Sequence, residues 1–326
     1  MARVAVVFTG GTISMRLDPV SRAAVPALGG AEILALTPGL DAIADVLPVD
    51  WGLVPASHLS FAQILDIGRV LAEALARPEI DAAVVVQGTD AMEETAFAWD
   101  LLIDGDKPVA VVGAMRNADA PDYDGPGNLR DAVRVAAHPS ARGLGALVVM
   151  HGSVLPADDA TKVHTDNLDA FRALNAGPLG RVSDRGVRID GVRGPRRHLP
   201  RIPTAAVEPV FIVPASVGSD GALLRAALAA GARGIVVAAT GSGNTHPDLL
   251  QAAKEAMAAG VPVAFTTRAA SGSVSGGYGF PGGGATWIAA GAMPTGTLGG
   301  PKARVALALG LGAGLAGDDL RRFLAG

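Results

Sequence analysis

The chain has 326 residues, more than one hydrophobic core usually holds, so its length predicts two domains. Apolar residues make up 49% of it and charged residues only 18%, which excludes an intrinsically disordered chain. The formal net charge is -4 without a basic stripe, so we expect no nucleic-acid partner. The absence of cysteine excludes disulfides, thiolate metal sites and a cysteine nucleophile.

Metal binding and membrane association are also disfavoured. The six histidines include no His-x-x-x-His pair, so we expect no metal site. No apolar stretch reaches the length of a membrane span without a glycine, proline or charge, so we expect no membrane association. A strand predicted from residue 4 leaves no room for a secretory signal, which favours a cytoplasmic location.

Buried strands alternate with helices along the chain. Unalternating aliphatic runs predict strands at Val4–Phe8, Ala82–Val86, Pro108–Val112, Ala146–Met150, Gly234–Ala239 and Val261–Thr266. Helical patterns lie at Phe61–Ala76, Met92–Leu102, Asn128–Ala137, Gly221–Ala230 and Pro247–Ala259. This alternation indicates an α/β fold whose main sheet is parallel and wound.

A stretch rich in proline, glycine and arginine, residues 186–203, interrupts the alternation and is typical of a linker. We therefore predict a larger N-terminal α/β domain over residues 1–190, a linker over 191–207 and a smaller C-terminal α/β domain over 208–326. A glycine-rich stretch at 271–284 predicts a loop near a site or an interface.

The first strand ends in Thr9-Gly10-Gly11-Thr12, where a parallel sheet places its ligands. The two glycines allow a tight turn and a close backbone approach. A plain tight loop is the structural alternative. The glycine pattern of a dinucleotide site is absent, which excludes a dinucleotide enzyme.

A second strand ends in Gln87-Gly88-Thr89-Asp90 and leads into a helix. Asp90 with Glu93 fits a helix cap, which is the structural alternative for that carboxylate. Lys162 is one of only four lysines beside 23 arginines, a bias that singles it out as a useful deprotonatable amine. A threonine hydroxyl needs a base, and a Thr–Lys–Asp relay can supply one, so these residues indicate nucleophilic acyl transfer.

Two further residues are interpreted as scaffold. Asp124 is predicted to fix the loop after Val112-Gly113-Ala114-Met115-Arg116, and Asn128 to cap the helix that follows.

Seven motifs occur in the order found in one family. They are Thr9-Gly10-Gly11-Thr12-Ile13, Gly88-Thr89-Asp90 with Met92-Glu93-Glu94-Thr95, Gly113-Ala114-Met115-Arg116, Asp124-Gly125-Pro126 with Asn128-Leu129, Asn175-Ala176-Gly177-Pro178-Leu179-Gly180, Gly241-Ser242-Gly243-Asn244 and Pro301-Lys302-Ala303-Arg304. Over nearly its whole length the chain resembles the bacterial-type L-asparaginase/glutaminase family. The resemblance implies a two-domain asparaginase-like fold.

The resemblance also implies roles. Thr12 attacks the side-chain amide of asparagine to form an acyl-enzyme, and Thr89, Asp90 and Lys162 relay protons. Ser57 binds the substrate α-carboxylate, Asp90 the α-ammonium, and backbone N–H groups around Thr89 the oxyanion. The remaining implied substrate-binding residues are Gly11, His58, Gly88, Ala114 and Asn244, the last from a neighbouring subunit. The family implies a homotetramer of intimate dimers without a cofactor.

The sequence departs from the family pattern in three ways. The lid after the first motif, residues 14–28, carries no tyrosine, and the two tyrosines of the chain, Tyr123 and Tyr278, are placed elsewhere. No acidic residue lies between Glu255 and Asp318, where many secreted members of the family supply a glutamate from the neighbouring subunit to the substrate ammonium. Gln87, Ala91 and His58 replace a histidine, a threonine and a glutamine, substitutions that we interpret as tuning.

These departures keep two alternatives open beside an asparagine amidohydrolase. One is the same chemistry on another amide, such as glutamine, D-asparagine or an N-blocked substrate. The other is a non-catalytic amino-acid-binding relative that kept the fold.

Overall fold

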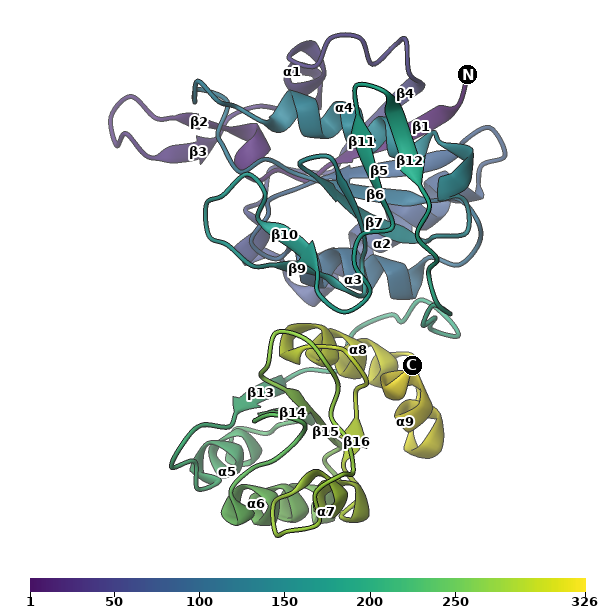
Figure 1. Cartoon of the computed structure of the whole chain (residues 1–326). Coiled ribbons are helices and arrows are strands. Elements are labelled where there is room, and N and C mark those ends of the chain that lie inside the picture. Colours follow the sequence, from purple (N-terminus) through teal and green to yellow (C-terminus); the bar gives the residue numbers. More distant parts are fainter. The chain divides into compact units, whose positions relative to one another are not determined.

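The computed structural model describes residues 1–326, which form two units, Met1–Arg196 and Arg197–Gly326 (Figure 1). The division falls inside the range 191–207 that the sequence assigns to a linker. None of the helices combines the length and the apolar character that crossing a membrane requires.

The first unit is built on an eight-stranded sheet in the order β12-β11-β8-β7-β6-β5-β1-β4. Its strands are β1 (Arg3–Phe8), β4 (Asp45–Asp50), β5 (Ala82–Val86), β6 (Val109–Val112), β7 (Ala146–Met150), β8 (Ser153–Pro156), β11 (Gly180–Ser183) and β12 (Gly186–Ile189). The strands from β4 to β7 pair in parallel, whereas β8, β11 and β12 extend the β7 edge in antiparallel. Every residue of β5, β6 and β7 is buried, as expected for strands covered on both faces.

Helices cover both faces of this sheet (Figure 1). α2 (Phe61–Ala76) and α3 (Met92–Leu102) lie on one face, and α4 (Gly125–Ala136) lies on the other. The smaller elements are α1 (Gly30–Ala35), the 3₁₀ turns η1 (Thr12–Ser14), η2 (Ala56–His58) and η3 (Pro139–Ala141), the hairpin β2 (Met15–Leu17) and β3 (Ala24–Pro26), and the pair β9 (Ala160–Lys162) and β10 (Phe171–Ala173). The β2–β3 hairpin extends away from the sheet of this unit.

The start of α2 shows how local sequence specifies an element. Ser60 precedes the helix and forms a reciprocal capping box with Gln63, whose backbone N–H donates to Ser60 Oγ over 3.3 Å. Apolar residues then recur at helical spacing, and Ile64, Leu65 and Leu71 among them are buried. The predicted bounds of α2 are confirmed.

The segment 191–196 is packed into the first unit. Arg193 donates to Asp100 Oδ2 over 2.5 Å and to Asp158 Oδ1 over 2.8 Å, and Arg196 donates to Asp100 Oδ1 over 3.2 Å. Burial opposes the charged form of Arg193, but the carboxylates of Asp100 and Asp158 outweigh it and raise the pKa of the guanidinium. This ion cluster holds the chain end of the unit against α3.

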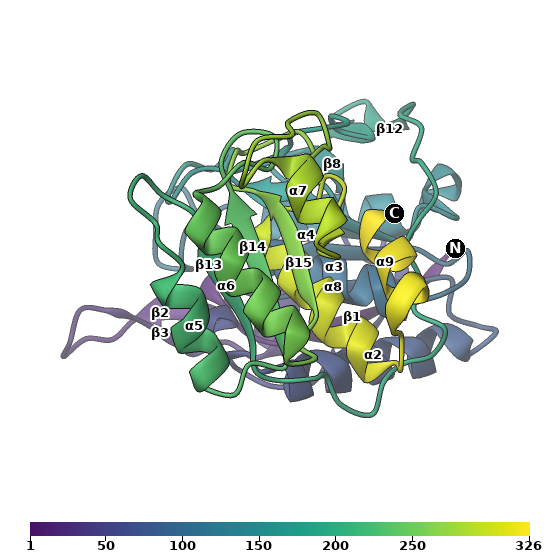
Figure 2. The same ribbon diagram turned by 90° about the horizontal axis from the view of Figure 1, so that it is seen from below.

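The second unit has a parallel sheet in the order β13-β14-β15-β16. Its elements are β13 (Val210–Pro214), α5 (Ala222–Ala229), β14 (Gly234–Ala239), α6 (Pro247–Ala258), β15 (Val263–Thr267), α7 (Gly284–Ala289), β16 (Met293–Pro294), α8 (Gly300–Gly312) and α9 (Gly317–Ala325). Figure 2 shows α5 and α6 on one face of the sheet, and α8 packs against the other. The predicted α/β class with a larger N-terminal and a smaller C-terminal sheet is confirmed.

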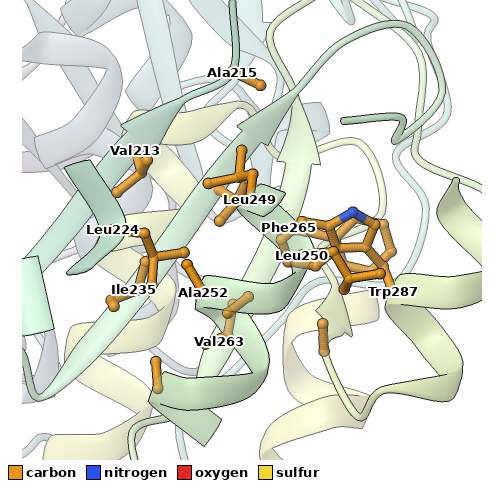
Figure 3. Close-up of a cluster of buried hydrophobic side chains, with 14 of the residues drawn as sticks. Val213, Ala215, Leu224, Ile235, Leu249, Leu250, Ala252, Val263, Phe265 and Trp287 are labelled. Atoms are coloured by element: carbon orange, nitrogen blue, oxygen red, sulfur yellow. The ribbon is translucent and has the colours of Figure 1, made fainter. Parts of the chain in front are cut away.

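An aromatic pair is the bulkiest part of the core between this sheet, α5, α6 and α7 (Figure 3). Phe265 of β15 stacks on Trp287 of α7 with ring centroids 5.7 Å apart, and both side chains are fully buried. The indole N–H of Trp287 donates to Thr245 Oγ1 over 3.0 Å, which satisfies its one polar group. Truncating such an aromatic residue typically costs about 3–5 kcal/mol.

Candidate active site

Glycines bring three segments of the first unit together beyond the carboxyl ends of β1 and β5. β1 and β5 are paired in parallel, with Phe8 opposite Val86, so the turns that follow them are neighbours. A Cβ atom on Gly11 would overlap the backbone of Gly88, and one on Gly88 would lie 3.0 Å from the Cβ of Ala56. Gly11 also has a φ of 92°, which disfavours a side chain. The residues next to these contacts are Thr12, Thr89 and Ser57.

A lysine joins the second threonine to a carboxylate. Lys162 Nζ lies 2.9 Å from Thr89 Oγ1 and 2.9 Å from Asp90 Oδ1. The Thr89 residue is 4% exposed, and the Lys162 side chain is 16% exposed, whereas the Asp90 side chain is 71% exposed. A hydroxyl, an amine and a carboxylate in hydrogen-bond contact form a route for proton transfer.

Glu93 fixes the backbone that carries this lysine. The backbone N–H of Lys162 donates to Glu93 Oε2 over 2.9 Å, linking β9 to the first turn of α3. The interpretation of Asp90 as a helix cap is wrong, because α3 begins at Met92 after Ala91, without a side-chain cap. The carboxylate of Asp90 instead faces Lys162. Sequence reasoning missed the role of Glu93, since its spacing from Asp90 resembled a capping box.

The loop before β9 is held by Asp159. Its buried carboxylate accepts hydrogen bonds from the backbone N–H groups of Asn175 and Ala176 at 2.9 and 2.8 Å. The Asn175 side chain donates to Asp159 Oδ1 over 2.7 Å. The motif that begins at Asn175 therefore supports the strand that presents Lys162.

A second hydrogen-bond network organises the loop after β6. The Asp124 carboxylate accepts from the N–H groups of Met115 and Arg116, which confirms the prediction that it fixes this loop. Asn128 is not the predicted cap, because α4 begins at Gly125 and Asn128 lies inside the helix. Its buried side chain donates to Gly113 O over 3.1 Å and accepts from the N–H of His151. Asn128 thereby ties the ends of β6 and β7 together.

This loop lies against the second threonine. A Cβ atom on Gly113 would come 3.2 Å from Thr89 Cγ2, so any side chain there would press on that residue. Ala114, the next residue and a predicted substrate contact, is fully buried.

Tyr123 lies beside the Thr12 turn, although it stands outside the lid segment 14–28 in the sequence. Its hydroxyl donates to Ile13 O over 2.8 Å. The separation of 110 residues along the chain explains why no sequence pattern reveals this contact. Thr12 itself is half-buried at the start of η1, and Ser14 N–H closes that turn on Gly11 O over 2.9 Å.

The remaining predicted residues are distributed as follows. Ser57 and His58 are exposed on η2. Gln87 is fully buried and donates to Thr95 Oγ1 over 2.5 Å, which confirms that it can still donate a hydrogen bond. Asn244 belongs to the second unit, in a turn closed by hydrogen bonds with Thr240, and its Oδ1 is buried without a hydrogen-bond partner. No group of three or more histidine or acidic side chains is placed to hold a metal ion.

Two family models match the chain. Residues 3–193 match the family model described as "Asparaginase, N-terminal", and residues 209–324 match "Glutaminase/Asparaginase C-terminal domain". Together the two models cover most of both units.

Individual relatives agree with this match. A probable L-asparaginase of Deinococcus radiodurans is 38% identical over 325 residues, covering 99% of this chain and 97% of the relative. An L-asparaginase of Bacillus licheniformis is 32% identical over 282 residues, covering 86% of each chain. The crystal structure of a probable cytoplasmic L-asparaginase from Campylobacter jejuni superposes with a TM-score of 0.86 at 28% identity, covering 99% of this chain and 98% of that one. The chain therefore belongs to the bacterial-type asparaginase family of hydrolases.

Proposed function

We propose that the chain hydrolyses the side-chain amide of L-asparagine to L-aspartate and ammonia through an acyl-enzyme on Thr12. The observation that carries the proposal is the Lys162 ammonium group, 2.9 Å from both Thr89 Oγ1 and Asp90 Oδ1. Thr89 lies on the strand-end turn that Gly11 packs against, and Gly11 directly precedes Thr12. Relatives named L-asparaginase support the choice of substrate.

The reaction has two halves. The Thr12 hydroxyl oxygen attacks the amide carbon, its proton passes to the leaving nitrogen, and the C–N bond breaks to release ammonia. The ester left on Thr12 is then hydrolysed by water, which gives the aspartate side chain and restores the hydroxyl. Thr89, Lys162 and Asp90 relay the protons, and backbone N–H groups near Thr89 stabilise the negative oxygen by a few kcal/mol.

The substrate-binding residues come from four segments of the first unit. Ser57 binds the α-carboxylate and Asp90 the α-ammonium, with Gly11, His58, Gly88 and Ala114 lining the site. Asp90 carries the ammonium charge nearly alone, because the sequence has no acid between Glu255 and Asp318, where many secreted members of the family supply a glutamate from a neighbouring subunit. Losing one buried charge partner typically costs about 2–5 kcal/mol of binding, so we expect weak affinity for free asparagine.

The same missing acid favours a second candidate, an amide whose α-amine is blocked or differently placed. Glutamine, D-asparagine and N-acylated asparagine are the members of this class to compare with L-asparagine.

The test is ammonia release from L-asparagine and from this panel by the wild type, Thr12→Ala and Thr89→Ala. Turnover of L-asparagine by the wild type, with a loss of about 10³-fold or more in both variants, supports the proposal. If the wild type turns over another amide of the panel and not L-asparagine, that amide is the substrate. Binding of aspartate by calorimetry without turnover of any amide contradicts an enzyme.

Assembly, cofactor use and location complete the proposal. We propose a homotetramer of intimate dimers in which Asn244 serves a neighbouring subunit, with no cofactor. Light scattering that gives the mass of four chains supports the assembly, and the mass of one chain contradicts it. We also propose a cytoplasmic location, as described for the Campylobacter relative. Activity in the periplasmic fraction of the cells that naturally produce the chain would contradict that location.

A further inference from the structure

The loop between β6 and α4 holds the segment after Thr12 at three successive points. Tyr123 Oη donates to Ile13 O over 2.8 Å. Ala118 N–H donates to Met15 O over 2.9 Å. Leu17 N–H donates to Asp119 Oδ2 over 2.7 Å. The residues that lead from η1 into β2 are therefore anchored to the body of the first unit, and Tyr123 makes the anchor next to Thr12.

The Thr12 turn has little freedom once Tyr123 is in place. Ser14 N–H closes the turn on Gly11 O, and Met15 N–H donates to Thr12 O. The position of Gly11 is set by its contact with Gly88, which leaves no room for a side chain. The Ser14 carbonyl accepts from the N–H groups of Ala27 and Leu28, and the Ile13 carbonyl accepts from the Tyr123 hydroxyl, which fixes its direction.

The ring of Tyr123 is itself held in place. It packs over Gly125, the first residue of α4, where a Cβ atom would overlap both the ring and its hydroxyl oxygen. Burial, assisted by the neighbouring Asp124 carboxylate, raises the pKa of Tyr123 to about 12. The phenol therefore keeps its proton at neutral pH and acts as a hydrogen-bond donor, without serving as a base.

We propose that Tyr123 is a positioning residue for Thr12, whose hydroxyl holds the Ile13 carbonyl and thereby fixes the turn that aims the nucleophile. The proposed function gives Tyr123 no role, and its kinetic test rests on that function because amide hydrolysis is the readout. The lid segment 14–28 contains no tyrosine, and Tyr123 is a tyrosine from another loop that contacts the Thr12 turn.

The kinetic test compares Tyr123→Phe with Tyr278→Phe, which removes the half-exposed tyrosine of the second unit. Tyr123→Phe should lower kcat about tenfold, equivalent to about 1.4 kcal/mol, and leave KM within twofold, because Ser57 and Asp90 lie on other segments. The alkaline decline of kcat with pH should be the same in Tyr123→Phe as in the wild type, since the raised pKa of the Tyr123 phenol keeps it protonated there. An unchanged kcat, or a shifted alkaline limb that marks a titrating catalytic group, overturns the proposal.

Amide hydrogen exchange provides a readout that does not depend on activity. Exchange at Ser14 N–H should accelerate in Tyr123→Phe and stay at the wild-type rate in Tyr278→Phe, because only the first variant frees the turn. Gly125→Ala should have the same effect as Tyr123→Phe, because it displaces an intact phenol, and it serves if Tyr123→Phe does not fold. Unchanged exchange at Ser14 in the folded variants overturns the proposal, even if the wild type hydrolyses none of the amides. Inactivity of the wild type with accelerated exchange contradicts the proposed function alone.

Discussion

The two threonines of the candidate site stand at the ends of neighbouring parallel strands, but they are held in different ways. Thr89 is buried, and its hydroxyl accepts a hydrogen bond from a lysine that also contacts Asp90. Thr12 is half-buried in a turn whose hydrogen bonds end on the backbone carbonyls of Gly11, Thr12 and Ile13. One threonine is part of a side-chain network, and the other is carried by a fixed backbone.

This difference suits different chemical tasks. A hydroxyl already bonded to an amine can pass a proton at once, because donor and acceptor are within reach before substrate arrives. A hydroxyl presented by a rigid turn can approach a substrate carbon, because no side-chain partner has to be released first. We therefore infer that Thr12 attacks and that Thr89 relays.

The largest expected effect comes from removing the amine of the relay. Lys162→Met keeps the length of the side chain and should lower kcat about 10²–10⁴-fold, the range typical for loss of acid–base catalysis. Lys254→Met on the exposed side of α6 is the matched control and should retain wild-type turnover. Equal activity in the two variants, measured by ammonia release, would show that Thr89 needs no lysine.

The next effect separates stability from catalysis. Asp100→Asn leaves the buried Arg193 and Arg196 short of a carboxylate and should lower the free energy of unfolding by about 3–5 kcal/mol. Asp190→Asn breaks the exposed pair with Arg188 and should change stability little. Urea unfolding measures both variants. A small effect of Asp100→Asn would mean that the end of the first unit is not held by this cluster.

Glu93 should sharpen the comparison between the threonines, because it acts only on the Lys162 side. Glu93→Ala removes the acceptor for Lys162 N–H and should lower kcat about tenfold, whereas Glu93→Gln keeps an acceptor oxygen and should recover most of it. Glu73→Gln on the exposed face of α2 controls for the loss of charge. If Glu93→Gln is as impaired as Glu93→Ala, the charge of Glu93 matters and its hydrogen bond does not.

The last effect is confined to alkaline solution, where the stability of the fold near the Thr12 turn depends on pH. Folding raises the pKa of Tyr123 from 10.0 to about 12, so the folded state holds this proton more tightly than the unfolded state. The resulting stabilisation is complete below pH 10 and is lost as the pH rises from 10 to 12. Tyr123→Phe should remove this part of the alkaline decline in melting temperature. Superimposable declines in the wild type and the variant would contradict the assignment.

Local patterns predicted the elements that position the site. The all-apolar run of β5 and the capped, periodic pattern of α2 have the bounds expected from sequence. α8 (Gly300–Gly312) was not predicted from the sequence. Its alanine, leucine and glycine residues are distributed almost evenly around the helix axis, so no apolar stripe marks one face. The antiparallel strands β8, β11 and β12 at the β7 edge are too short to show a recognisable pattern of apolar residues.

Contacts within the site were less accessible to sequence reasoning. Lys162 was identified by its residue type, but its approach to Thr89 joins positions 73 residues apart. Glu93 and Asn128 were interpreted through helix-capping rules, whereas tertiary hydrogen bonds determine their roles. The contact of Tyr123 with the Thr12 turn was not predicted, because no local pattern marks a side chain that crosses between loops.

The assignment of Thr12 as the nucleophile and Thr89 as the proton relay is tested most directly by locating the acyl group. The wild type is mixed with saturating L-asparagine, quenched in acid within milliseconds, digested and analysed by peptide mass spectrometry. We expect an aspartyl ester on the peptide that contains Thr12 and an unmodified peptide around Thr89, with no ester in Thr12→Ala. An ester on Thr89 in the wild type, or one that persists in Thr12→Ala, would contradict the assignment of Thr12 as the nucleophile.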